Sequence, residues 1–562
     1  MIGLWALPLA VWLIATAWFG FDIGKYSDDW AISLRTPETD AYQWPASPFI
    51  RWHYFWRPAH LLAVYGLATV FWHHDWVNHA ISALAHLGVG LLLYRLLCVV
   101  GIGSVAARCA LSLFLVVPVS VEAVLWPAAL GSVVGVGWFL MIALKCARLV
   151  REAAPGRAGW RAWLGLATMA FLAACWHEQP AAAVLALPLL FMALREENTW
   201  GPVLRRGIIA TGACAVGVAS YIALFVATVP PGRRGGSSTL VGAHAIGHRL
   251  WRLGEMAWNI SLGARARDTT RDAWALGGRA IRESPGGVGW VAIASAILLG
   301  VWWVVALARA ESRRPAGVPG ARLARLDRGT LAVFGLGIAV ASVLPIALVA
   351  TQPMQARYLY GAGAGIAIAL AAGMDALLVG TRRAGRRSAW SVALAALSAC
   401  MALCGAVCCM GWQTEFRQRS LADVDQMAQL RRLVPDPARG AVFVPLELSD
   451  GRMPHLRAYN PGVLGAITAP WSCWAYVQRG YRRSDVTATH VRPGQRVPLN
   501  ADDSGIHYPR GLCDAWGVAD PAKTLVPWER AVVFAVDREG AVRLVSREEA
   551  LNRLGGASPP KE

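Results

Sequence analysis

The chain has 562 residues, 56% of them hydrophobic, and a mean hydropathy of +0.41. This composition is too apolar for an ordinary water-soluble protein, so we predict a polytopic membrane protein. The formal charge of +19 comes almost entirely from arginine. The arginines gather in short connections between apolar runs, which indicates cytoplasmic loops and not a nucleic-acid partner.

The first apolar stretch runs from Ile2 to Phe21 and is about 20 residues long, enough to cross a bilayer. No basic segment precedes it and no small-residue cleavage site follows it, so we expect a retained transmembrane segment and not a signal peptide. Asp28 and Asp29 come shortly after it, in the first loop.

The three arginine clusters decide the expected topology, because one additional crossing would put later clusters on the wrong side of the membrane. They lie within residues 148–161, 309–328 and 382–387. With Met1 inside, all three are cytoplasmic and the first loop faces outward. We expect a multi-pass protein of the bacterial inner membrane with about eleven transmembrane helices, near residues 2–21, 78–97, 105–121, 130–147, 162–176, 180–194, 207–229, 286–308, 329–350, 358–379 and 389–411.

The apolar run from Ala59 to Trp72 is too short to count as a crossing. Pro58 suits the first turn of a helix, and aromatic residues flank the run like an interfacial belt. We therefore predict an interfacial helix, with a short tilted crossing as the alternative.

A separate soluble domain is predicted beyond Gly411, because residues 412–562 contain dispersed charges, several prolines and no spanning segment. An odd number of crossings from a cytoplasmic N-terminus puts this domain on the extracytoplasmic side. Residues 1–411 form the membrane domain. Alternating patterns predict strands at Ala441–Leu446 and Ala531–Val536, and helices at Ser420–Leu433 and Arg547–Leu554. The fold class is thus an all-α polytopic membrane protein with a small C-terminal α/β domain.

Nine of the eleven cysteines lie in or beside the membrane segments, where core packing is the expected role. Cys473 and Cys513 belong to the outer domain. An oxidising compartment would permit a disulfide between them, and two free thiols are the alternative. The chain has no cysteine or histidine array typical of a metal site.

The residues that can carry chemistry all fall on the predicted outer face. Asp28 and Asp29 are candidates for a general base with an orienting acid, the alternative being a solvated or helix-capping pair. Arg57, with His53 and His60 nearby, could bind a phosphate through its planar donors, or simply contact lipid headgroups.

Further candidates mark three more outer helix ends. They include Glu122 and the pair His177 and Glu178. An ionisable group at membrane depth is costly, so we expect Glu178 to have a partner or a polar cavity; an interfacial position of these acids is the alternative. Arg357, next to Tyr358, is expected on the outer side, whereas most arginines of the chain are expected in cytoplasmic loops. An anionic ligand would explain this position. The alternative is an arginine whose side chain extends to the membrane interface.

Several of these segments together resemble the GT-C superfamily of polyprenyl-phosphate-sugar-dependent glycosyltransferases, in particular its protein O-mannosyltransferase-like branch. They are spread over residues 1 to about 379. The segments are Ser27-Asp28-Asp29-Trp30, Trp56-Arg57-Pro58, Asn78-His79, Val121-Glu122-Ala123-Val124-Leu125-Trp126, His177-Glu178-Gln179 and Arg357-Tyr358-Leu359-Tyr360.

The resemblance implies a GT-C-like fold and an inverting transfer of sugar from a polyprenyl-phosphate donor to a hydroxyl of a protein, glycan or lipid acceptor. Asp28 would be the base, Asp29 would orient it, and Arg357 would hold the donor phosphate. An oxygen-rich site of this kind is compatible with Mg²⁺ or Mn²⁺. A transporter or flippase for a lipid-linked sugar, and a non-catalytic membrane scaffold, remain as alternatives.

Overall fold

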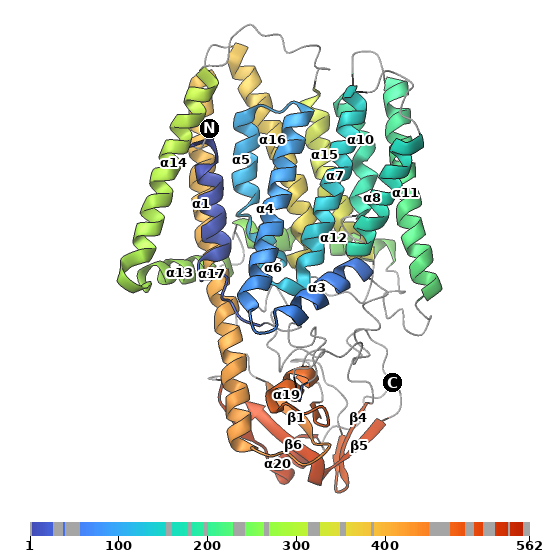
Figure 1. Ribbon diagram of the computed structural model, residues 1–562, viewed down its shortest axis with the longest axis vertical. Helices are drawn as coiled ribbons and strands as arrows, with labels where there is room; N and C mark the ends of the chain where they lie inside the picture. Colours follow the sequence, from blue (N-terminus) through green and yellow to red (C-terminus); the bar gives the residue numbers. More distant parts are fainter. Residues whose placement is uncertain are drawn as a thin grey trace.

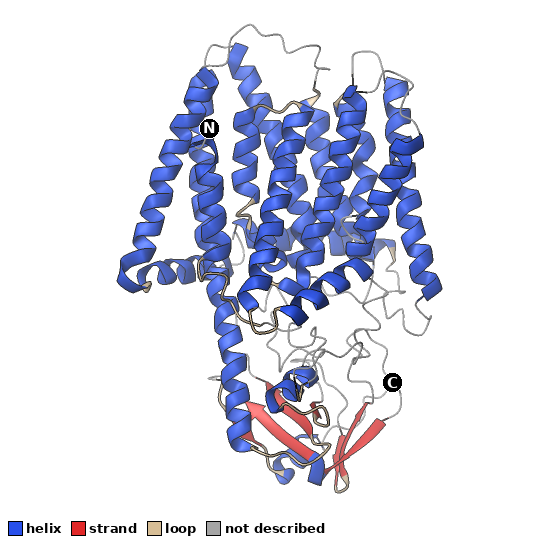
Figure 2. Cartoon of the chain, in the orientation of Figure 1, coloured by secondary structure: helices blue, strands red, loops and turns tan. Residues whose placement is uncertain are grey.

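The computed structural model describes residues 3–25, 37–39, 57–152, 160–177, 181–195, 200–228, 242–262, 269–312, 326–348, 356–383, 387–448, 473–488, 500–509, 523–537 and 540–554. Most of this part is a bundle of helices that run along the long axis of the molecule, and strands form a smaller region at one end (Figures 1 and 2). The helices along the axis are α1 (Gly3–Ala17), α4 (Asp75–Val100), α5 (Ser104–Phe114), α7 (Leu130–Glu152), α8 (Trp160–Trp176), α10 (Leu187–Ala193), α11 (Trp200–Thr228), α14 (Val288–Ser312), α15 (Arg328–Leu348), α16 (Tyr360–Arg383) and α17 (Arg387–Leu433).

Seven helices in the described residues are long and apolar enough to cross a membrane. These seven helices are α4, α7, α11, α14, α15, α16 and α17. The prediction of an all-α polytopic protein is therefore confirmed at this level. The other axial helices are shorter; α5, for example, has 11 residues and a length of about 16 Å at 1.5 Å per residue.

Among the described helices outside this axial set, α3 (Pro58–Val70), α12 (Ala243–Leu262) and α13 (Thr269–Arg282) lie near the end of the bundle that faces the strands. Figure 1 shows α3 and α13 across that end, whereas the C-terminal ends of α7, α14 and α16 lie at the opposite end. The position of α3 agrees with the prediction of a helix that does not cross.

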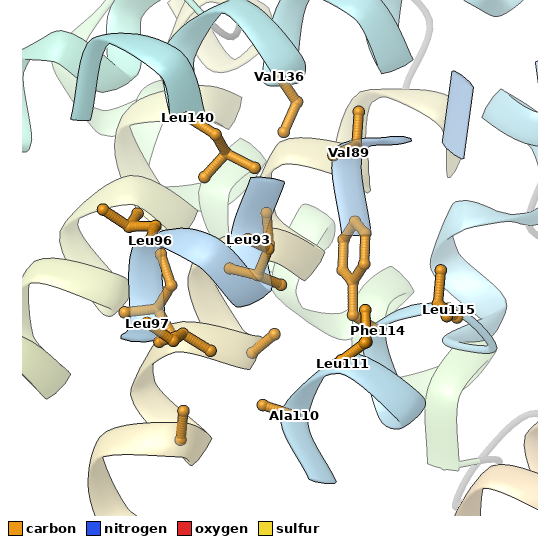
Figure 3. Packing of buried hydrophobic residues seen from close by; sticks show 14 of the residues in the cluster. Val89, Leu93, Leu96, Leu97, Ala110, Leu111, Phe114, Leu115, Val136 and Leu140 are labelled. Carbon is orange, nitrogen blue, oxygen red and sulfur yellow. The ribbon is translucent and has the colours of Figure 1, made fainter. Parts of the chain in front are cut away.

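The bundle has a continuous apolar core. Leu93 and Leu97 of α4 pack with Leu111 and Phe114 of α5 and with Leu140 of α7, all of them buried (Figure 3). This core holds α4 and α5 in fixed positions, and the polar residues discussed below lie at or near one end of these helices.

Glycines allow a close contact between α15 and α16. A Cβ on Gly335 of α15 would lie 2.5 Å from the carbonyl oxygen of Gly365 on α16, and a Cβ on Gly365 would collide with the carbonyl of Gly335 in return. Small residues of this kind let two backbones approach closely in membrane helices. The α15–α16 pair therefore forms a tight unit within the bundle.

Helix α17 connects the bundle to the strand region. It has 47 residues, which corresponds to about 70 Å at 1.5 Å per residue, and it continues without a break through residues 411 and 412. Its last turns enter the C-terminal core, where Met427 and Leu430 pack with Phe443, Tyr476 and Phe534. The bundle and the C-terminal region thus share one helix.

In the residues that the structure describes, the C-terminal region contains two small sheets and two short α-helices. One sheet has the order β2-β1-β6-β7, with β1 parallel to β2 and β6, and β6 antiparallel to β7; the other is antiparallel, in the order β3-β4-β5. The elements are β1 (Val442–Leu448), α19 (Cys473–Tyr481), β2 (Thr487–Ala488), β3 (Asn500–Asp502), β4 (Gly505–Pro509), β5 (Lys523–Pro527), β6 (Ala531–Val536), β7 (Val542–Leu544) and α20 (Arg547–Leu554). The strands and helices predicted here from sequence are present.

Cys473 is buried at the start of α19, and burial raises the pKa of its thiol to about 12. Cys513 lies outside the described residues, so the proposed disulfide remains a prediction.

Candidate functional site

Of the residues predicted to form a site, Asp28, Asp29, His53 and Glu178 lie outside the described part of the chain. The structure does place Arg57, Glu122, His177, Arg357 and Tyr358. Glu122 belongs to α6 (Val121–Leu125), which lies at the end of the bundle that faces the strands (Figure 1).

Prolines create the short elements that carry Glu122. After α5 the chain turns through η2 (Pro118–Ser120), α6 (Val121–Leu125) and η3 (Pro127–Ala129) before α7 begins. Pro118 and Pro127 each occupy the first turn of a 3₁₀ helix, where the missing N–H costs no hydrogen bond. Glu122 is therefore held on a five-residue helix at the bundle end and is buried.

Arg357 is brought to Glu122 by η8 (Ala356–Leu359), which precedes α16. The backbone N–H of Arg357 donates to Glu122 Oε2 at 2.9 Å, and Arg357 Nη1 lies 3.7 Å from Glu122 Oε1. The Glu122 side chain is 4% exposed and that of Arg357 18%. A buried carboxylate needs such a partner, and Arg357 supplies it for Glu122.

Aromatic rings surround the same guanidinium. Its central carbon lies 4.3 Å from the ring centroid of Trp126 and 5.2 Å from that of Tyr358, and Nη2 donates to the Tyr358 hydroxyl at 3.4 Å. The planar guanidinium suits this stacking, which fixes its orientation. Arg357 is thus held by a carboxylate and by two rings.

His177 extends the cluster towards α8 and α3. Its ring centroid lies 6.5 Å from that of Tyr358, and the neighbouring Trp176 lies 6.5 Å from the ring of His60. A Cβ on Gly131 would lie 2.5 Å from His60 Nδ1 and 2.9 Å from the carbonyl oxygen of Trp176, so only glycine fits here. We call Glu122, Trp126, His177, Arg357 and Tyr358 the Arg357 cluster.

Arg57 stands at the start of α3, with Pro58 in the first turn as predicted. It is half-buried, and its carbonyl accepts a hydrogen bond from the N–H of Leu61. Its expected role in phosphate binding remains a prediction.

Two features of this end of the bundle were not predicted from the sequence. Lys25 Nζ donates to Asp75 Oδ1 at 2.7 Å, which joins the segment after α1 to the first turn of α4. His86 Nδ1 lies 2.8 Å from the hydroxyl of Tyr360. The only sequence signal for them was the polar spacing of Asp75, His79, Ser82 and His86 along one apolar helix.

Within the described residues, no three histidine, cysteine, aspartate or glutamate side chains are grouped so that they could hold a metal ion. No family model matches the chain, and no curated protein is significantly similar to it. The functional argument therefore rests on the arrangement of these side chains.

Proposed function

We propose that the chain is an integral membrane glycosyltransferase of the GT-C type. It moves a sugar from a polyprenyl-phosphate donor to an acceptor hydroxyl on the extracytoplasmic face, with inversion. The observation that carries the proposal is the pairing of the buried Glu122 with Arg357 at the end of the bundle that also bears the strand region. We further propose eleven crossings, which put this end and the C-terminal region outside the cytoplasm of a bacterial inner membrane.

The arrangement supports this chemistry for an electrostatic reason. A phosphate leaving group requires positive charge more than protonation, and a guanidinium in a partly buried site supplies that charge with little solvent screening. Because Glu122 and the rings of Trp126 and Tyr358 fix its orientation, Arg357 would need little rearrangement to meet a phosphate. Asp28 would accept the proton of the acceptor hydroxyl, with Asp29 beside it, and Arg57, His177 and Glu178 would help to bind the substrates.

A transfer assay tests the proposal. The full-length protein, reconstituted in lipid nanodiscs, is incubated with a radiolabelled polyprenyl-phosphate hexose and with hydroxyl-bearing acceptors. We expect transfer that falls by about a hundredfold or more in Asp28→Asn, the scale of general-base catalysis, and in Arg357→Ala. Full transfer by the Asp28→Asn and Asp29→Asn variants would remove the base assignment, and donor translocation without bond cleavage would indicate a transporter instead.

A further inference from the structure

A pocket lies beside the Arg357 cluster, between α3, the first two turns of α4 and the start of α7. Its polar lining consists of Lys25, Asp75, Asn78, His79 and Ser82, and apolar residues such as Leu67 and Trp72 complete the wall. We call it the α4 pocket. It contains about 440 Å³ of empty space including its open mouth, but the centre of a water molecule can occupy only about 20 Å³. That is room for one water molecule or one hydroxyl group.

Two residues of α4 that line this pocket each have a buried polar atom without a hydrogen-bond partner in the described structure: Asn78 Oδ1 and Ser82 Oγ. His79 is 3% exposed and Ser82 0%. Ser112, an equally buried serine on α5, instead donates to the carbonyl of Arg108 one turn earlier at 3.0 Å. The hydroxyl of Ser82 makes no such bond, although buried polar groups are normally satisfied.

The chemistry of these atoms specifies the group that would fit. His79 is already bound to the backbone, because its Nε2 lies 3.0 Å from the carbonyl oxygen of Gly24 and the carbonyl of Leu125 is a second backbone neighbour of the ring. Asn78 Oδ1 is an acceptor, while the hydroxyl of Ser82 can donate or accept. The pocket therefore requires a group that donates.

The charges at the rim of the pocket further limit the class of ligand that it can bind. Lys25 Nζ is bound to Asp75 at 2.7 Å and to the carbonyl oxygen of Trp72 at 2.7 Å, so the positive and negative charges neutralise each other. Asp75 disfavours an anion, and Lys25 disfavours a cation. A neutral hydroxyl satisfies both conditions.

We propose that the α4 pocket binds the acceptor hydroxyl of the substrate. Asn78 Oδ1 accepts from that hydroxyl, and Ser82 donates to its oxygen. The assignment of this hydroxyl to an acceptor rests on the proposed glycosyltransferase function, whereas the binding of a hydroxyl-bearing ligand by the pocket does not. The substrate class is a neutral polyhydroxyl compound, of which one hydroxyl enters the pocket and the remainder stays in the open mouth.

Direct binding tests the pocket independently of catalysis. Saturation-transfer difference NMR is recorded with methyl β-glucoside as the probe and the full-length protein in nanodiscs. We expect a signal for the unmodified protein, and a three- to tenfold weaker affinity in Asn78→Ala and Ser82→Ala, about the effect of one lost hydrogen bond. Ser112→Ala, which removes a buried serine hydroxyl elsewhere, should leave the affinity unchanged.

The outcomes separate the two proposals. The pocket proposal is overturned if the unmodified protein does not bind the probe, because the pocket then holds only water. Equal affinity in all variants also overturns it, as does an equal loss of affinity in Ser112→Ala. Binding that depends on Asn78 and Ser82 without any turnover of the labelled donor upholds the pocket and overturns the glycosyltransferase. Turnover in which neither variant changes the KM for methyl β-glucoside upholds the enzyme and overturns the pocket.

Discussion

Arg357 and Glu122 are 235 residues apart in the chain, yet the carboxylate accepts from the backbone of Arg357 and lies close to its guanidinium. Each residue was predicted from sequence as an ionisable group at an outer helix end. Their pairing was not predicted, because spacing along the chain carries no information on which helix ends meet. The stacking of Trp126 on the guanidinium was not predicted for the same reason, because it depends on how α6 packs against η8.

The Glu122–Arg357 pair should contribute to stability. We expect Glu122→Gln and Arg357→Gln each to lower the free energy of unfolding, with a coupling energy of about 1–3 kcal/mol in the double-mutant cycle, because each single variant leaves a buried group without its partner. Thermal unfolding of the detergent-solubilised protein provides the measurement. Arg252 and Glu255, an exposed pair on α12, serve as the control, for which about 0–0.5 kcal/mol is expected. Purely additive effects of Glu122→Gln and Arg357→Gln would show that the contact contributes nothing.

Asp327 links stability to pH at the opposite end of the bundle. The N–H and the hydroxyl of Thr330 donate to its carboxylate, at 3.0 and 2.8 Å, and Arg195 lies 3.3 Å away. The Thr330 N–H, and with it the Thr330 hydroxyl and Arg195, lower the pKa of Asp327 below its ordinary value, although burial opposes the shift. Because the folded pKa is depressed, the stabilisation is complete above the unfolded pKa and is lost as pH falls through the folded pKa.

We therefore expect Asp327→Asn to be less stable than the unmodified protein at neutral pH, by about 1 kcal/mol as for a weakened helix cap. The difference should shrink below about pH 4, where the unfolded aspartate begins to be protonated. Unfolding temperatures of both proteins between pH 7 and pH 3 give the measurement. A difference that is constant over this range would contradict the role assigned to the charged carboxylate.

At the scale of elements, close helix contacts explain why the predicted domain boundary falls inside a helix. The boundary was predicted beyond Gly411 because dispersed charges and prolines, without a spanning segment, begin there. In the structure Gly411 lies against the backbone of Ala273 on α13, and α17 continues past it to Leu433. The composition shows where the apolar run ends, but a helix can continue beyond that point.

The α15–α16 contact provides a test at the same scale. We expect Gly365→Ala to destabilise the protein by about 1–3 kcal/mol, because the added methyl group meets the backbone of Gly335 and Ala339. Gly373→Ala on the same helix is the matched control: nothing lies within 4 Å of its Cβ position, and alanine favours a helix over glycine by up to about 1 kcal/mol. The thermal unfolding of both variants is measured. Equal changes in stability for Gly365→Ala and Gly373→Ala would show that α15 and α16 do not cross so closely.

At the scale of the whole molecule, the predicted strands and helices of the C-terminal region were found because their alternation and helical periodicity are local properties. The position of this region against the bundle was not predictable. It depends on the length of α17 and on contacts between distant segments, among them a hydrogen bond from the N–H of Ser484 to Glu38 in the segment after α1.

Arg479 on α19 makes a second such contact. Its guanidinium carbon lies 4.1 Å from the ring centroid of Trp72, a residue of the α4 pocket wall, and the ammonium of Lys25 lies 4.4 Å from the same centroid. A residue of the C-terminal region thereby holds one wall of the pocket. The contact gives this region a direct influence on the pocket, in addition to the covalent connection through α17.

We expect Arg479→Ala to loosen this wall without unfolding the protein. The loss of one cation–π contact, about 0.5–1 kcal/mol, should speed amide hydrogen exchange by about two- to fivefold in the turn between α3 and α4, residues 71–74. Exchange measured by mass spectrometry on the nanodisc-bound protein reports this directly. Arg432→Ala, which truncates an exposed arginine near the end of α17, should leave the exchange of this turn unchanged. If the two variants have the same exchange in residues 71–74, the C-terminal region does not support the pocket through Arg479.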